Sequence, residues 1–96
     1  MSAQELENYL WAIVESYGPI APDCNDLLRD LIHKGALQVE SQGELTNQSK
    51  IDLAEKNTRM LLDTMKIFAI QSGVPELHEF TFGSALQKLC PIFPFC

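Results

Sequence analysis

The sequence is poor in positive charge and has no long apolar run. Seven Lys and Arg residues stand against thirteen Asp and Glu residues, so the formal net charge is −6. Proteins bind nucleic-acid backbones and anionic lipid surfaces mainly through Lys and Arg. We therefore expect no nucleic-acid partner and no membrane partner. No stretch approaches the roughly 18 consecutive apolar residues of a transmembrane helix, so we expect no membrane span.

Residues that carry chemistry are also sparse. Cys24, Cys90 and Cys96 match no metal or redox spacing. Neither His33 nor His78 has a second histidine or cysteine at the spacing of a zinc site. The chain contains no nucleophile elbow and no phosphate-binding glycine loop. These absences predict a protein that is not an enzyme and that has no metal ligand and no cofactor.

The amino-terminal end is acidic, and no basic leader precedes the first apolar residues. A secretory signal or a transit peptide carries positive charge there, so we expect a cytoplasmic protein. Thiols stay reduced in that compartment. This setting argues against a disulfide between Cys90 and Cys96, although the spacing permits one.

The longest regular pattern runs over residues 47–72 and predicts one helix. Its apolar residues recur at helical spacing over roughly 220° of the circumference. They are Ile51, Leu53, Ala54, Met60, Leu61, Leu62, Met65, Ile67, Phe68 and Ala69. The polar strip holds acid-before-base pairs such as Glu55–Arg59 and Asp63–Lys66. A helix with so narrow a polar strip must be packed on at least two other sides, which predicts a central helix in an all-α domain.

The ends of this helix are marked by Thr46 or Asn47 as the N-cap and by Gly73 as the stop. Its 1.5 Å rise per residue gives a length of about 39 Å. A compact domain of this size has a diameter of roughly 33 Å. We therefore expect either a bend near residues 56–58 or an end that projects toward a second protein.

Two shorter amphipathic helices are predicted before the central one. The first is capped by Ser2 and stops at the Gly-Pro pair of residues 18–19. The second begins near Asp23 and ends at residues 33–35, where two basic side chains precede a glycine. Residues 36–45 are expected to form a loop or a minor β-hairpin.

After the central helix the pattern is weaker. Pro75 is suited to the first position of a short helix that reaches Phe80. Another turn or two of helix is expected within residues 82–90. Two prolines then prevent a regular helix over residues 91–96.

Together these patterns predict one all-α domain over residues 1–90, followed by an apolar Pro/Phe tail at residues 91–96. The domain is expected to be a single bundle of four to five helices around the central helix. The predicted core residues are those that fall on the inward faces of the helices. They are Leu6, Leu10, Ile13, Val14, Leu27, Leu28, Leu31, Ile32, Leu61, Met65, Phe68 and Ala69.

Two features lie outside that core and predict an interaction surface. Leu53, Met60 and Ile67 form a second apolar line with a period of seven residues. Such a line suits either a neighbouring helix of the same chain or a helix of a partner. Trp11 lies off the main apolar stripe of the first helix, where it either widens the buried face or serves as a contact residue.

The tail contributes Phe93 and Phe95 to the same candidate surface. These rings either close the core of their own domain or dock on another subunit as an exposed anchor or swapped arm. A third interpretation is that the sequence is one domain of a longer chain.

These observations favour a non-enzymatic adaptor or assembly module that binds protein. The partner is a copy of itself, giving a homo-oligomer, or a basic or apolar protein. One alternative is a small acidic chaperone or carrier that holds a polypeptide or an apolar ligand in a groove between helices. Another is a winged-helix-like transcriptional regulator, because two helices precede a possible hairpin.

Overall fold

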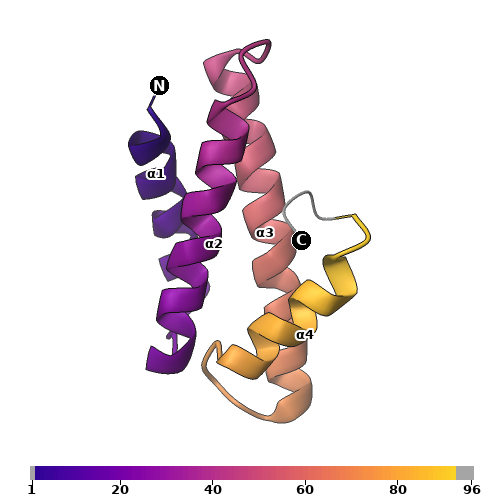
Figure 1. Cartoon of the computed structure of the whole chain (residues 1–96). Coiled ribbons are helices and arrows are strands. Elements are labelled where there is room, and N and C mark those ends of the chain that lie inside the picture. Colours follow the sequence, from indigo (N-terminus) through magenta and orange to yellow (C-terminus); the bar gives the residue numbers. More distant parts are fainter. Residues whose placement is uncertain (1, 93–96) are drawn as a thin grey trace.

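The computed structural model describes residues 2–92 and folds them into four helices (Figure 1). The helices are α1 (Ala3–Ser16), α2 (Pro22–Glu40), α3 (Asn47–Ser72) and α4 (Glu79–Leu89). Within this part of the chain the only β-type pairing is an isolated bridge between Ile20 and Leu77. The predicted all-α bundle is confirmed, with four helices.

Three helix ends form as their sequence signals predict. The Ser2 hydroxyl accepts the Glu5 backbone N–H at 3.2 Å and caps α1. The Thr46 hydroxyl accepts the Ser49 backbone N–H at 3.1 Å and caps α3. Gly73 ends α3 with a φ of 72°, a left-handed conformation that glycine adopts without a steric penalty.

The end of α2 differs from the prediction. Residues 33–35 do not terminate the helix, which continues to Glu40, so the loop covers only residues 41–46 and no hairpin forms there. Val39 is buried and holds the extra turn against the core. Lys50 Nζ donates to the Glu40 backbone oxygen at 3.2 Å and to its carboxylate at 3.0 Å. A cation at the last carbonyl stabilises the longer helix.

The start of α2 also differs. Pro22 occupies the first turn and Ala21 is the N-cap, with no side-chain cap. Asp23, expected at the cap, lies in the first turn instead. A negative charge near the helix N-terminus is favourable in either place.

The chain between α3 and α4 forms no short helix, so the prediction of a helix starting at Pro75 is wrong. This connector instead runs beside the one between α1 and α2. The Ala21 N–H donates to the Leu77 oxygen at 2.9 Å, and the Leu77 N–H donates to the Pro19 oxygen at 3.0 Å. These bonds satisfy backbone groups that a helix would otherwise have paired. The helix begins only at Glu79.

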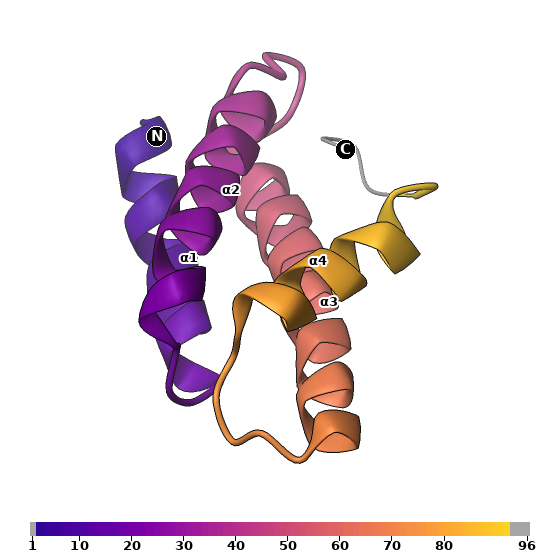
Figure 2. The ribbon, with the colours of Figure 1, turned by 60° about the horizontal axis from the view of Figure 1, so that its bottom comes forward.

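The first three helices lie side by side and alternate in direction, and α4 crosses α3 obliquely (Figures 1 and 2). α3 contacts each of the other helices, whereas α4 packs on α3 and α2 and, within the described residues, does not contact α1. This arrangement is consistent with the predicted central position of α3, which α2 shares, because α2 also contacts each of the other helices. It leaves one flank of α3 next to α4 and the other next to α1.

All four helices contribute to one core. Each predicted core residue is buried except Leu27, Leu31 and Phe68, which are partly buried and pack against the margin of the core. The core also takes residues from α4 that the sequence analysis did not select. These are Phe82, Ala85 and Leu89.

α3 is unbroken from Asn47 to Ser72, so the expected bend at residues 56–58 does not occur. The domain measures 42 × 25 × 18 Å. Its long axis matches the length of a helix of about 39 Å. The prediction of a bend or a projecting end assumed a spherical domain, and an elongated bundle makes both unnecessary.

The cysteines differ in their states. Cys24 is free and buried, as expected for a structural thiol. Cys90 is disulfide-bonded, although the expected reducing compartment argued against a bridge from Cys90 to Cys96. Cys96 lies outside the described residues.

Candidate interaction surfaces

The line of Leu53, Met60 and Ile67, here called the α3 apolar edge, lies at the margin of the core. Leu53 and Met60 are partly buried and pack against the core cluster. Ile67 does not belong to that cluster and is 50% exposed. The edge therefore begins as core packing and ends as exposed apolar surface.

Trp11 lies on a different face from the α3 apolar edge. Its ring is covered by Arg29 of α2, whose Cζ lies 4.2 Å from the ring centroid. The neighbouring Glu7 and His33 side chains are 2.9 Å apart and join the same two helices. Trp11 thus takes part in the packing of α1 on α2, through a cation–π contact. The contact given for its ring is with α2 and not with the α3 apolar edge, as far as residues 2–92 show.

The remaining two predicted contact residues, Phe93 and Phe95, lie outside the described residues. Their role as an anchor stays a prediction.

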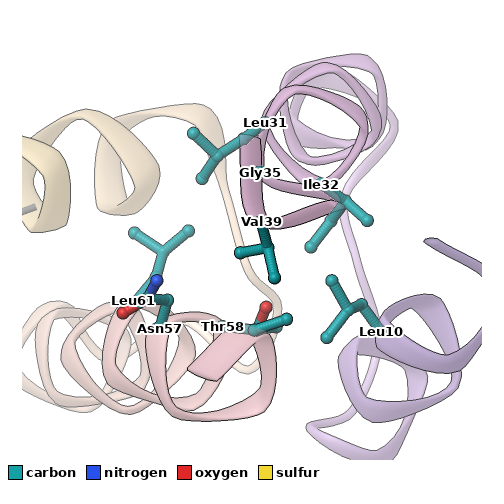
Figure 3. Close-up of a pocket in the computed structure, with 9 residues that line it drawn as sticks. Leu10, Leu31, Ile32, Gly35, Val39, Asn57, Thr58 and Leu61 are labelled. Carbon is teal, nitrogen blue, oxygen red and sulfur yellow. The ribbon is translucent and has the colours of Figure 1, made fainter. Parts of the chain in front are cut away.

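A narrow crevice separates α2 from α3 above Leu10 (Figure 3). Leu31, Gly35, Asn57 and Leu61 are among the residues that line it. The space that water can occupy there is about 10 Å³. That is the volume of one water molecule at most, so this crevice has no room for an apolar ligand.

A second concavity lies between the amino-terminal parts of α2 and α4, and we call it the α2/α4 hollow. It is open to solvent, with a volume of about 520 Å³. Its lining residues are Asp23, Leu27, Glu79, Phe80, Phe82 and Gly83. The sequence analysis did not select this surface. The available signal was the pair Phe80 and Phe82, because residues two positions apart on a helix point about 200° apart and cannot both face the core.

Beside the apolar core that α1 and α3 share, exposed side chains of the two helices are hydrogen-bonded to each other. The Tyr9 hydroxyl donates to the Glu55 carboxylate at 2.8 Å, and the Tyr17 hydroxyl donates to Asp63 at 2.7 Å. The bond to Glu55 raises the pKa of Tyr9. Burial and then the bond to Asp63 raise the pKa of Tyr17. Both phenols are therefore protonated donors at neutral pH.

The predicted ion pairs on this strip form only in part. Arg59 Nε lies 3.0 Å from the Glu55 carboxylate, as expected. Lys66 instead donates to the Tyr17 backbone oxygen at 3.4 Å. The Arg59 guanidinium, followed by Tyr9, lowers the pKa of Glu55.

Two observations concern the groups that the sequence analysis considered for chemistry. Burial, followed by the charges of Asp23 and Glu79, raises the pKa of the Cys24 thiol to about 11, so the nucleophilic thiolate is scarce at neutral pH. The described residues include no group of three or more His, Cys, Asp or Glu side chains placed to hold a metal ion. None of the four helices combines the length and apolar character needed to cross a bilayer, as far as residues 2–92 show.

Comparison with known proteins gives no family for this fold: no family model, no curated protein and no solved structure matches the chain.

Proposed function

We propose that this domain is a non-enzymatic protein-interaction module that self-associates through the α3 apolar edge. The observation that carries the proposal is the position of Ile67. It continues the line of Leu53 and Met60 out of the core and remains 50% exposed on the longest helix. Exposed apolar surface that is continuous with a core is a common feature of protein interfaces.

A second copy is the occupant that the geometry of the edge favours. The three residues are spaced by seven, with Met60 in the middle. An antiparallel pair of α3 helices with a two-fold axis near Met60 places Leu53 of one copy opposite Ile67 of the other. Such an interface uses the same patch on both copies, as two-fold dimers do. The seven-residue period keeps the line on one side of both helices.

Charge opposes this association at low salt. Each copy carries a net charge of −6, so two copies repel each other at a distance. Salt screens this repulsion, because the Debye length falls to about 8 Å at physiological ionic strength. The proposed dimer should therefore become tighter as salt concentration rises.

Analytical ultracentrifugation from roughly 10 μM to 1 mM tests the proposal. The wild-type protein is expected to reach a dimer in the upper part of this range. Ile67→Lys should weaken association by roughly tenfold or more, because it places a charge at the interface. The matched control is Leu37→Lys on α2, where the leucine is 48% exposed, and it should not change association. A wild-type protein that stays monomeric throughout the range would overturn the proposal.

The cytoplasmic location expected from the sequence is a separate part of the proposal. Disulfides persist mainly in oxidising compartments. The disulfide at Cys90 therefore favours an oxidising compartment over the reducing cytoplasm expected from the sequence. Mass spectrometry of alkylated protein isolated from its native cells would decide between them, because only a free thiol is labelled.

A further inference from the structure

The α2/α4 hollow is an apolar surface that the α3 apolar edge does not include. Phe82 is buried and Phe80 is 50% exposed, so apolar surface continues from the core into the hollow. Partly buried Leu27 forms the α2 side. A Cβ atom added at Gly83 would meet no atom within 4 Å, so the space above this residue is open.

The rim of the hollow is acidic. Asp23 and Glu79, one from the first turn of each helix, line it. Both carboxylates lie close enough to Cys24 for their charges to raise the pKa of its thiol. The two negative charges are therefore near each other at this end of the domain. No Lys or Arg is found among the lining residues of the described chain. The basic side chain paired with the rim is His78, whose Nδ1 lies 3.6 Å from the Asp23 carboxylate.

We propose that the α2/α4 hollow binds a segment of another protein that presents an apolar side chain next to Lys or Arg. The apolar side chain would contact Phe80, Phe82 and Leu27, and the basic group would pair with Asp23 or Glu79. Apolar anchors with a complementary charged rim are a common basis of specific recognition. This inference goes beyond self-association, since it concerns other helices and another partner.

The charge of the chain argues for a foreign partner rather than a second copy. A second copy of net charge −6 would meet two carboxylates at this rim in addition to the general repulsion that also opposes dimerisation at the α3 apolar edge. A locally basic segment is attracted to the same rim. The attraction weakens with salt, whereas the proposed self-association strengthens with salt.

A random-peptide display library panned against the full chain is the direct test. We expect enriched peptides to share an aromatic or aliphatic residue with Lys or Arg close to it. In fluorescence titrations with the best enriched peptide, Phe80→Ala should weaken binding by roughly tenfold. Neutralising the rim with Asp23→Asn and Glu79→Gln should weaken it by a smaller factor and reduce its salt dependence. Ile70→Ala on α3, at a position that is 70% exposed, is the matched control and should leave binding unchanged.

The variant Gly83→Leu distinguishes a loss of peptide binding from a loss of folding. Leucine favours the helix over glycine by up to about 1 kcal/mol, so this variant should be at least as stable as wild type in a thermal melt. Its side chain enters the open hollow, so peptide binding should fall by roughly tenfold or more. Unchanged peptide binding by Gly83→Leu, enriched peptides without a basic residue, or no enrichment at all would overturn the proposal.

Two further outcomes would identify other occupants and overturn the proposal as well. If Phe80→Ala reduces self-association in ultracentrifugation, the hollow is filled by a second copy. If peptides are enriched only on a Phe93→Ser/Phe95→Ser variant, the chain itself occupies the hollow. Ile67→Lys keeps the hollow intact, so peptide binding by this variant distinguishes failure of the dimer from failure of this site.

Discussion

The two flanks of α3 are covered in different ways. On the flank that faces α1, directional bonds join the helices, including those from Tyr9 to Glu55 and from Tyr17 to Asp63. On the α3 apolar edge the contacts are apolar, and they fade from partly buried Leu53 to half-exposed Ile67. The flank that faces α1 is covered by that helix, whereas the α3 apolar edge is exposed at its Ile67 end.

The difference matters because the two kinds of contact constrain a neighbour differently. A hydrogen bond is satisfied only within a narrow range of distance and angle, so the tyrosines fix the register of α1 on α3. Apolar burial has no preferred direction and accepts any complementary surface. The bonded flank therefore constrains how α1 lies on α3, whereas the contacts of the α3 apolar edge impose no direction on a neighbouring surface.

The largest expected effect is on the free energy of unfolding, and it compares a residue on the buried face of α3 with one on the α3 apolar edge. Leu61→Ala removes a side chain that is 1% exposed, and its loss from the core should reduce the free energy of unfolding by about 2–5 kcal/mol. Ile67→Ala removes a half-exposed side chain and should cost about 1 kcal/mol or less. Urea denaturation of dilute, monomeric protein measures both. An Ile67→Ala loss as large as that of Leu61→Ala would show that the edge belongs to the folded monomer and would break the comparison.

A second variant tests whether polar links also fix α3 against α2. Lys50 is 7% exposed and pairs with Glu40 at 3.0 Å. Lys50→Met keeps the alkyl chain but leaves the partly buried carboxylate without its cation, so unfolding should become easier by about 1–3 kcal/mol.

Glu40→Gln supplies the partner for a double-mutant cycle with Lys50→Met. The double variant should lose less stability than the sum of the two single changes, because both remove the same interaction. Strict additivity would show that the pair contributes nothing to the junction between α2 and the loop.

The sequence predicts helix ends well where the signal is local and poorly where it depends on tertiary contacts. The Thr46 hydroxyl accepts a backbone N–H only three residues along the chain, and Gly73 acts through its own backbone, so both ends of α3 were predictable. Gly35 resembles a helix stop, yet the helix continues because Val39 is buried and Lys50 binds Glu40. Neither contact can be seen before the chain is folded.

The same limit applies to the candidate surfaces. The period of seven identifies the line of Leu53, Met60 and Ile67, but not which member stays exposed, since that depends on where α4 crosses α3. The sequence left two roles open for Trp11 because its partner, Arg29, belongs to another helix.

A smaller effect is expected on the bonded flank. Tyr17→Phe removes a hydroxyl that donates to Asp63 at 2.7 Å, and it should lower stability by about 0.5–1.5 kcal/mol. Tyr9→Phe removes a more exposed bond to Glu55 and should lower stability less. Urea denaturation at neutral pH gives both values. Two losses of equal size would contradict the idea that the more buried tyrosine sets the register.

The smallest expected effect is the alkaline pH dependence of the Tyr17 contribution. Its pKa is raised above the ordinary value of 10.0 by burial and by the bond to Asp63, so the folded state holds the phenolic proton more tightly than the unfolded state does. The resulting stability is fully present below pH 10 and is lost as pH rises through the raised pKa. The difference in unfolding free energy between wild type and Tyr17→Phe should therefore shrink from pH 8 to about pH 11.

Cys24 also titrates in this alkaline range, since its pKa is raised to about 11, but it is present in both proteins and cancels in the difference. A gap between wild type and Tyr17→Phe that stays constant with pH would show that the hydroxyl acts through packing rather than as a donor to Asp63. The bonded flank would then be held by non-directional contacts, as the α3 apolar edge is, and the contrast between the two flanks would lose its physical basis.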